Sequence, residues 1–400
     1  MKSKHLILLT SFYPFDNKET FIENEIAYLS KSFDTVQIVA VAKLHNDLIR
    51  PIPANCSAIN IGKQIVETPI KLSWFFNYAF IVEFVLNLFS NPLKNKILIR
   101  SWIKSHRIAC LVKPYVKPNT LVYSYWLDDK SIALTLLKKQ HPQIQTIARA
   151  HRWDIYNDEH LFAYFPMRKY LMKNIDAVYV ISTHGYEYLR ERYAGNYKIS
   201  RLGVFENHFS LLNEKSKVFK IVTCSAVISR KRLHLVAKSL QELQVGIPVE
   251  WTHIGDGELM HELVELTKKF PTNIKVNFLG NIKNNLIASI YSNGQFNLFI
   301  NVSESEGIPV SIMEAMAHSI PCIATDVGGS NEIVVSYKNG MLVSKDIQVE
   351  ALKKHIQYFI ELTYEKENEL KENAFKTWQE EYNADDNYNA FIKEITHLNK

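Results

Sequence analysis

Short apolar runs alternate with helical patterns along nearly all of this chain, and this alternation restricts the possible folds most. It is typical of parallel sheets, because each strand is joined to the next by a helix that covers one face of the sheet. In the first half we expect strands at 6–12, 35–41, 121–126, 146–151, 177–182 and 198–202, and helices at 20–32, 129–140 and 183–193. In the second half we expect strands at 219–226, 249–254, 274–279, 296–300, 321–327 and 341–343. The sequence therefore predicts an α/β fold.

The length predicts more than one domain, since 400 residues exceed what one hydrophobic core usually supports. With 47% apolar residues and only 13 Gly and 13 Pro, the composition is that of a globular protein. The polar segment 206–217 separates the two runs of alternation and is the expected linker. We therefore expect two Rossmann-like units that face one another, with the ligand in the cleft at the carboxyl ends of the strands.

Cysteine usage and hydropathy restrict the cellular context. The four cysteines are far apart and lack metal-ligand spacing, which predicts a reducing cytoplasm. The apolar run at 6–9 is too short for the core of a signal peptide and is interpreted as part of the first strand. The longest apolar stretch, 72–89, is interrupted by Asn77, Glu83 and Asn87, so it falls short of an apolar span of about 20 residues. We expect no transmembrane helix.

Positive charge is concentrated in one part of the first half, within a total net charge of +6. Residues 84–127 contain no acidic side chain, but they contain Lys94, Lys96, Arg100, Lys104, Arg107, Lys113 and Lys117. An aromatic run, 74–80, precedes them. Residues 72–117 therefore predict either docking on an anionic membrane surface or a core helix beside a solvated basic helix. Nucleic acid is the weaker expectation, because no nucleic-acid module accompanies the charge.

The segment 301–317 reads Asn-Val-Ser-Glu-Ser-Glu-Gly-Ile-Pro-Val-Ser-Ile-Met-Glu-Ala-Met-Ala. An apolar run ends before it, and we expect a helix to open at Pro309, whose fixed φ suits the first helical position. Free N–H groups at that helix start predict a site for an anion or a hydroxyl-rich ligand. Glu306 lies in the loop, and Glu314 lies about 7–8 Å along the helix axis from Pro309, so the two carboxylates could bind two parts of one ligand. A capped surface helix is the alternative.

The flanks of this segment carry a family resemblance. Glu306 to Val310, Glu314 to Ala317, the apolar strand at 321–325, Gly328-Gly329 and Glu332 together resemble the donor-site signature of the retaining glycosyltransferase family 4. The resemblance is strongest over 219–345 and weaker through the first half. It implies the GT-B fold: an acceptor-side Rossmann-like domain (1–205), a nucleotide-sugar-binding Rossmann-like domain (206–375) and a C-terminal helix (376–400) that crosses back to the first domain.

The same resemblance implies the roles of the donor-site residues. Glu306 would stabilise or orient the donor sugar at the reacting carbon, and Glu314 would hold the ribose. The backbone from Gly307 through Ile308 and Pro309 to Val310 would hold sugar hydroxyls.

A basic motif, Ser229-Arg230-Lys231-Arg232, follows the expected strand at 219–226. Positive side chains beside a helix start can neutralise the diphosphate leaving group of a nucleotide-sugar. Lys231 matches the diphosphate-binding lysine of the family, whereas Ala226 stands where the family has an arginine, so that role is vacant or has passed to Arg230 or Arg232. The chain has no Asp-x-Asp motif, and no metal is expected. A solvated helix start is the alternative.

In the first half, the string 149–154 resembles an Arg-Ala-His-Gly-x-Asp string of the family, with Arg152 in place of the glycine. The resemblance implies that His151 contacts the donor sugar or supports developing positive charge; the alternative is a structural hydrogen bond. Tyr13, Glu19 and Thr20 match an acceptor-side loop of polysaccharide-assembly members, although Glu19 and Thr20 are equally suited to cap the next helix.

The segment after the strand at 274–279 carries a weaker match. Asn281 and Ile282 lie where the family reads the nucleotide base. The tripeptide 255–257 is interpreted as a tight turn with donor contact as the alternative.

These features predict a retaining hexosyltransferase without a cofactor. It would move a sugar from a UDP- or GDP-sugar to a lipid-linked glycan acceptor in the synthesis of a bacterial surface polysaccharide, lipopolysaccharide or capsule. Same-face attack is favoured over a covalent intermediate, because no nucleophilic carboxylate is evident opposite Glu306. The expected location is the cytoplasm, at the inner face of the cell membrane. The rival hypotheses are a nucleotide-sugar epimerase of the same fold and an inactive, membrane-associated glycan-binding protein.

Overall fold

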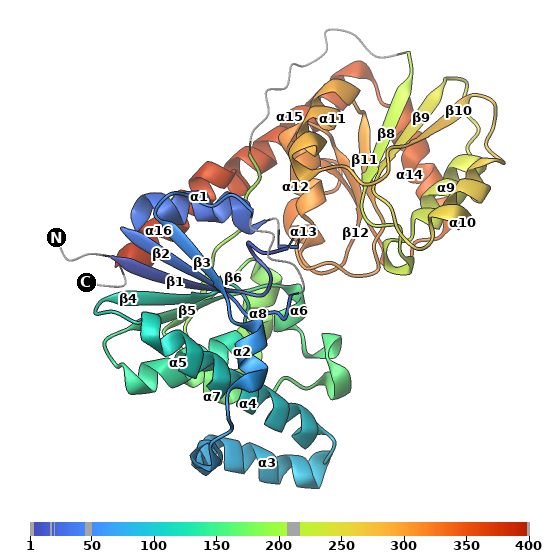
Figure 1. The fold of residues 1–400 in the computed structure, drawn as a ribbon. Helices are drawn as coiled ribbons and strands as arrows, with labels where there is room; N and C mark the ends of the chain where they lie inside the picture. The colour runs from blue at the N-terminus through green and yellow to red at the C-terminus, as the bar shows by residue number, and fades with distance from the viewer. Residues whose placement is uncertain (1–3, 17, 20, 45–49, 206–216, 398–400) are drawn as a thin grey trace. The chain divides into compact units, whose positions relative to one another are not determined.

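The computed structural model describes residues 4–16, 18–19, 21–44, 50–205 and 217–397, without the side chain of residue 285. The chain divides into two compact units, Met1–Ser200 with Tyr388–Lys400, and Arg201–Asn387 (Figure 1). The expected linker at 206–217 lies outside the described residues except for Lys217.

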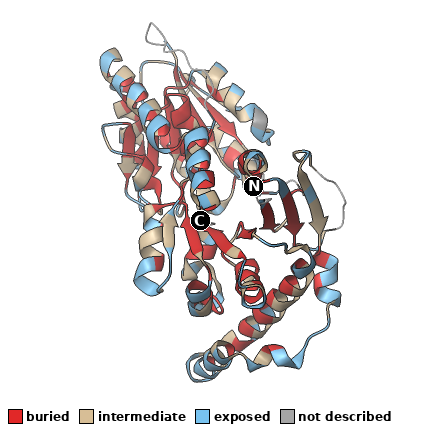
Figure 2. Ribbon diagram, turned by 90° about the vertical axis from the view of Figure 1, so that its left-hand side faces the viewer, coloured by how far each residue is buried: buried red, intermediate tan, exposed pale blue. Residues whose placement is uncertain are grey.

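The first unit is built on a parallel sheet of seven strands in the order β3-β2-β1-β4-β5-β6-β7. Its strands are β1 (His5–Thr10), β2 (Thr35–Ala40), β3 (Cys56–Asn60), β4 (Thr120–Ser124), β5 (Gln145–Ala150), β6 (Ala177–Val180) and β7 (Tyr197–Ile199). All six residues of β1 are buried, as expected for a parallel strand with helices on both faces. Figure 2 shows the same concentration of buried positions on the strands.

Helices connect these strands and cover the sheet. They are α1 (Ile22–Ser32), α2 (Gly62–Glu67), α3 (Tyr78–Ser90), α4 (Lys94–Val112), α5 (Asp129–Gln140), α6 (Arg152–Ile155), α7 (Arg168–Asn174) and α8 (Thr183–Arg192), with the 3-10 turns η1 (Leu72–Phe76), η2 (Lys113–Tyr115), η3 (Asn157–Glu159) and η4 (Leu161–Ala163). Helix α3 lies beyond α4, away from the sheet (Figure 1). The last helix, α16 (Ala384–His397), belongs to the first unit from Tyr388 onward.

The second unit repeats this design with a parallel sheet of six strands in the order β10-β9-β8-β11-β12-β13. The strands are β8 (Phe219–Cys224), β9 (Val249–Ile254), β10 (Ile274–Phe278), β11 (Leu298–Asn301), β12 (Cys322–Thr325) and β13 (Gly340–Val343). The helical elements are η5 (Ser229–Lys231), α9 (Leu233–Gln241), α10 (Met260–Thr267), α11 (Asn284–Gly294), α12 (Val310–Ala317), α13 (Ser330–Ile333), α14 (Val349–Glu361) and α15 (Tyr364–Glu381).

Each sheet reverses its strand order once, between β1 and β4 in the first unit and between β8 and β11 in the second. Ligands of open parallel sheets bind at the carboxyl ends of the strands at such a reversal. The loops that follow these four strands are therefore the places to look for a site in each unit.

The two parallel α/β units confirm the predicted fold class, with boundaries that differ locally. Strand β3 was not predicted, because Cys56–Asn60 is only half-buried and lacks a continuous apolar run. Helix α12 begins at Val310, so Pro309 is its N-cap and not its first residue as we expected. In the part of the chain that the structure describes, no helix combines the length and the apolar character needed to span a bilayer.

Candidate functional site

The strand reversal of the second unit places Lys231 and Glu306 in direct contact. Lys231 ends η5 in the loop after β8, and Glu306 lies in the loop after β11. The Lys231 Nζ lies 2.5 Å from the Glu306 Oε1, and the two side chains are only 17% and 11% exposed. The sequence predicted that these groups share one pocket, and the structure brings them together as an ion pair.

Neighbouring loops hold Glu306 in place. The Asn301 side-chain amide donates to the Glu306 Oε1 at 3.4 Å. Gly328 has φ +54°, and a Cβ there would lie 1.9 Å from the Glu306 carbonyl oxygen. Gly329 N–H donates to the Gly307 carbonyl at 2.7 Å. The Gly328-Gly329 pair is therefore required for the close approach of two backbone segments at the site.

Opposing effects act on the ionisation of Glu306. Burial disfavours the carboxylate, but the Lys231 ammonium and the nearby Arg230 guanidinium stabilise it. Together they lower the pKa of Glu306 below its ordinary value. The side chain is therefore a carboxylate at neutral pH.

The two arginines that flank Lys231 have different environments. The Arg232 guanidinium donates to the carbonyls of Val302, Ser303 and Lys345, so it holds the loop after β11 against neighbouring backbone. Arg230 donates only to the Ser305 carbonyl, at 3.2 Å. Of the two candidates that the sequence left open for the family arginine, Arg230 is the one with more donors left for a ligand.

Gly307, Ile308 and the N-cap Pro309 join Glu306 to the start of α12 at Val310. The first N–H groups of a helix have no intrahelical acceptor, and the helix dipole makes this end positive. Within the described residues, the N–H groups of Gly307 and Ile308 have no protein acceptor. This end of α12 can therefore donate hydrogen bonds to a ligand that contacts Glu306.

Glu314 is the fifth residue of α12 and faces the end of β8. Burial raises the pKa of its carboxyl to about 7. The carboxyl acts electrostatically on Cys224, the last residue of β8, and on Tyr291, and it has no hydrogen-bond partner among the described residues. It is an unused polar group on the same side of the sheet as Lys231.

The predicted base-reading residues lie apart from this cluster. Ile282 lines a cavity of about 790 Å³ beside β10 and α11, whereas Asn281 is exposed and does not line it. Neither Lys231 nor Glu306 lines that cavity. Gly255 has φ +135°, and a Cβ there would lie 2.0 Å from the Ser225 carbonyl oxygen, so the 255–257 segment is a tight turn.

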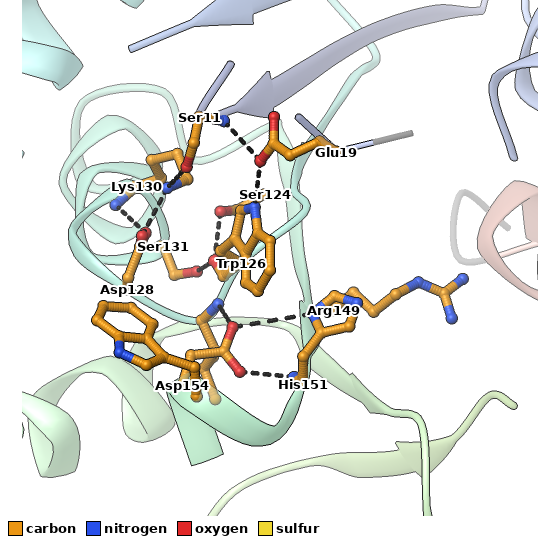
Figure 3. Close-up of polar contacts among 12 residues, drawn as sticks. Ser11, Glu19, Ser124, Trp126, Asp128, Lys130, Ser131, Arg149, His151 and Asp154 are labelled. Carbon is orange, nitrogen blue, oxygen red and sulfur yellow. Dashed lines mark hydrogen bonds and ion pairs between the residues drawn. The ribbon is translucent and has the colours of Figure 1, made fainter. Parts of the chain in front are cut away.

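The first unit gathers a polar cluster at its own strand reversal (Figure 3). The Glu19 carboxylate accepts hydrogen bonds from the N–H groups of Ser11, Phe12 and Tyr13 and from the Trp126 indole. It therefore fixes the loop after β1. Glu19 does not cap α1, whose N-cap is Phe21 without a side-chain bond, so the capping interpretation is wrong for this residue. Thr20 lies outside the described residues.

Lys130 and Asp128 are part of this cluster and were not predicted. The Lys130 Nζ lies 2.5 Å from the Asp128 Oδ2 and 3.0 Å from the Ser11 Oγ, and the lysine is only 1% exposed. Asp128 is also the N-cap of α5. The signal in the sequence was the Asp-Asp-Lys run directly after the predicted strand at 121–126.

His151 lies at the end of β5, next to this cluster. Its ring stacks on Tyr125 at 5.0 Å and lies 4.7 Å from Trp126. Its backbone N–H donates to Asp154, whereas neither ring nitrogen has a hydrogen-bond partner among the described residues. The ring Nδ1 lies 3.9 Å from the Asp154 Oδ2, and the role of the ring stays a prediction. Arg152, which stands where the family has glycine, is simply the first residue of α6.

Tyr13 contributes backbone and not side chain to the loop. Its ring is fully buried under the Arg50 guanidinium, 4.6 Å away, and burial raises the pKa of its hydroxyl to about 12. The structure thus brings Glu19 and His151 to one side of the sheet of the first unit but buries the Tyr13 side chain.

Residues 204–377 match the family model of glycosyl transferases group 1. The O-antigen biosynthesis glycosyltransferase WbnH of Escherichia coli is 32% identical over 132 residues, 33% of this chain and 35% of WbnH. The chain therefore matches only about a third of the length of that relative. The matched domain covers the Lys231 and Glu306 loops.

Solved structures of similar fold cover nearly the whole chain. Sucrose-phosphate synthase from Thermosynechococcus elongatus superposes with a TM-score of 0.73 at 17% identity, covering 99% of both chains. Anabaena Alr3699/HepE in complex with UDP superposes with a TM-score of 0.67 at 14% identity, covering 98% of this chain and 100% of HepE. At this identity they establish the fold, which is that of GT-B glycosyltransferases.

Proposed function

We propose that this chain, with its glycosyl transferases group 1 domain, transfers a hexose from a nucleoside-diphosphate donor to a hydroxyl of a growing bacterial surface glycan. One observation carries the proposal: the contact between Lys231 and Glu306 at the strand reversal of the second unit. Through this contact, a cation for the diphosphate (Lys231) and a carboxylate for the sugar (Glu306) lie next to the positive end of α12.

The residues of this site bind different parts of the donor. Lys231 and Arg230 neutralise the diphosphate, whose negative charge grows as the sugar–phosphate bond breaks. Glu306 orients the sugar at the reacting carbon once the diphosphate competes for Lys231. Glu314 accepts a hydrogen bond from the ribose.

The N–H groups at the start of α12 bind sugar hydroxyls, because they lack acceptors in the unliganded chain. These groups lie between Gly307 and Val310. The base-reading role of Asn281 and Ile282 stays a prediction.

His151 is proposed to contact the donor sugar from the first unit. Its two ring nitrogens have no hydrogen-bond partner among the described residues, and its backbone N–H is already held by Asp154. The aromatic contact with Tyr125 restricts the ring to one orientation. A ring so held can donate a hydrogen bond to a hydroxyl without a loss of side-chain entropy on binding.

Retention and metal independence are part of the proposal. Lys231 and Arg230 supply positive charge where other transferases use a divalent ion, so we propose that transfer needs no added metal. We propose same-face attack by the acceptor hydroxyl, since Glu306 is already committed to the donor.

The acceptor is proposed to be a lipid-linked glycan at an anionic membrane. The name of the relative WbnH supports a surface polysaccharide as the product. Helix α3 supports membrane docking, because Tyr78 and Phe89 are 83% and 87% exposed on an apolar helix. We expected Lys104 to contribute to docking, but its ammonium pairs with the Asp129 carboxylate at 3.0 Å.

The function is tested by replacing Glu306 with alanine. We expect sugar transfer from the best donor of a UDP- and GDP-sugar panel to fall at least about 100-fold, with a small change in melting temperature. Glu304→Ala is the matched control, because Glu304 is an exposed carboxylate of the same loop. Equal activity of the two variants would overturn the proposal.

A further inference from the structure

The first unit contains a pocket of about 900 Å³. Its walls come from α3, from the segment between α6 and α7, from α7 and from the end of α5. The volume lies within the usual range of small-molecule binding sites. Neither Glu19, Lys130 nor His151 lines it, so the pocket belongs to none of the groups given a role above.

One wall of the pocket is apolar and uncovered. Ala79, Val82 and Leu86 line it from one side of α3, where residues three and four apart share a face. Val82 and Leu86 remain 37% and 60% exposed. Fully covering such side chains stabilises by about 1.5–3 kcal/mol each, so this wall favours an apolar occupant.

The lining of the pocket includes a buried cation. Arg168 lines the pocket and is 2% exposed, and its guanidinium donates only to the carbonyls of Leu127 and Asp154. Its Nε has no hydrogen-bond partner among the described residues, and no carboxylate there lies within ion-pair distance of it. The Asp154 carboxylate acts on this charge electrostatically from a longer distance, and the Phe165 ring lies 3.5 Å from it. A buried charge without a direct ion pair is costly and favours a further anion nearby.

Four lysines add to this charge: Lys94, Lys139, Lys169 and Lys173 all line the pocket. Within the described chain none of the four forms an ion pair; Lys94 lies 5.4 Å from the centre of the Tyr164 ring. The acidic lining residue is Glu83, which already accepts hydrogen bonds from the Tyr164 hydroxyl and the Met167 N–H. The pocket therefore has an excess of positive charge.

An apolar wall opposite a group of cations fits an amphiphile. Inorganic phosphate or a nucleotide would satisfy the lysines but leave the α3 wall exposed to water. A neutral hydrocarbon would cover the wall but leave the lysines and Arg168 without a counterion.

We propose that this pocket binds one molecule of a phosphate-bearing lipid, with its hydrocarbon chain along α3 and its phosphate among the lysines. The pocket would bind the lipid part of the lipid-linked acceptor, and this part of the inference rests on the proposed function. Binding of the lipid itself requires no transfer reaction.

The test is thermal melting of the full chain with monomeric lipids. Dioctanoyl phosphatidylglycerol, kept below its critical micelle concentration, should raise the melting temperature by a few degrees at saturation, because a ligand of the folded state stabilises by mass action. Glycerol 3-phosphate, which has the head group alone, should leave the melting temperature unchanged. Dioctanoyl phosphatidylcholine, with the same chains and no net charge, should bind at least about tenfold more weakly.

Two pairs of variants locate the lipid. The double variant V82Q/L86Q changes the pocket wall and should abolish the shift. V85Q/L88Q is the matched control, because these residues of α3 are 42% and 49% exposed and do not line the pocket. K169Q/K173Q should weaken binding at least about tenfold, whereas K269Q/K275Q, two exposed lysines of the second unit, should not.

Three results would overturn the proposal. They are an equal shift with glycerol 3-phosphate, an equal loss in V82Q/L86Q and V85Q/L88Q, and a response to an acidic amphipathic peptide but to no lipid. Since the assay contains no sugar donor, loss of lipid binding and loss of transfer are separate outcomes. A chain that binds the lipid but shows no E306A-sensitive transfer would retain this inference and lose the proposed function.

Discussion

The Lys231 Nζ and the Glu306 Oε1 lie 2.5 Å apart, although 75 residues separate them in the chain. Both side chains are largely withdrawn from water, so each charge depends on the other for compensation. The cation that we propose for the diphosphate and the carboxylate that we propose for the sugar neutralise one another. By this proposal, a donor that draws Lys231 to its phosphates frees Glu306 at the same moment.

The pair should show strong coupling in stability. Lys231→Met leaves a nearly buried carboxylate without its counterion and should lower the free energy of unfolding by about 3 kcal/mol. Adding Glu306→Gln removes that charge, so the double variant should be at least about 1 kcal/mol more stable than the sum of the single changes predicts. Urea unfolding of the four proteins measures this. Additive changes would show that the two groups do not compensate one another.

The neighbouring arginines should separate stability from ligand binding. Arg232→Gln removes the guanidinium donors from three carbonyls and should lower the free energy of unfolding by about 2 kcal/mol. Its affinity for UDP should stay nearly unchanged. Arg230→Gln loses one such bond and should retain most of its stability, but its affinity for UDP should fall about tenfold. Calorimetric titration with UDP at a temperature where both variants are folded distinguishes the two. The reverse pattern would assign the diphosphate to Arg232.

Part of this site was predictable from the sequence. Lys231 and Glu306 each follow an apolar run, and the ends of parallel strands share one edge of a sheet. Their direct contact requires β8 and β11 to be neighbours, and strand order is set by long-range pairing that no local pattern records. The two units share the same strand order around β1 and β8. No internal repeat was detected in the sequence, because strand order can be the same in two units whose local sequences differ.

The cluster of the first unit was less predictable. Glu19 and Trp126 are 107 residues apart, and Lys130 and Ser11 are 119 apart, so their hydrogen bonds depend on the pairing of β1 with β4. Local rules left Glu19 equally suited to a helix cap and to the acceptor-side loop. The carboxylate instead accepts hydrogen bonds from the backbone amides of Ser11, Phe12 and Tyr13, because the loop after β1 would otherwise bury unpaired donors.

Glu314 makes stability depend on pH. Burial raises its pKa to about 7 from an ordinary value of 4.5, so the folded chain binds this proton more tightly than the unfolded chain. The resulting stability is present below about pH 4.5 and is lost as the pH rises to about 7. Glu314→Gln removes the titrating group and therefore this loss of stability. The free energy of unfolding of the variant minus that of the wild type should rise by up to about 3 kcal/mol between pH 4 and pH 8. Urea unfolding across this range tests the prediction. Glu304→Gln, at an exposed position, should show no such trend, and an equal trend in both variants would contradict it.

The glycine pair tests the loop that supports Glu306. Gly328→Ala places a Cβ 1.9 Å from the Glu306 carbonyl oxygen, which forces two backbone segments apart. We expect a loss of more than about 3 kcal/mol in the free energy of unfolding, or displacement of Glu306 and loss of transfer. Gly280→Ala is the control, because Gly280 also has positive φ but has open space around its Cβ, so only a backbone cost of about 1 kcal/mol applies. Similar losses in both variants would show that φ alone, and not the close approach, requires glycine at 328.

Glu19→Gln tests the loop of the first unit. The carboxylate oxygens accept hydrogen bonds from three backbone N–H groups and the Trp126 indole, and a glutamine side chain offers one acceptor oxygen and an amide group that donates. Because Glu19 is only 7% exposed, the orphaned donors cannot turn to water, and the variant should lose about 3 kcal/mol in the free energy of unfolding. Glu23→Gln on α1, where the Glu23 side chain is 45% exposed, should lose less than about 1 kcal/mol. Urea unfolding compares the two, and equal small losses would mean that water, and not Glu19, satisfies the loop after β1.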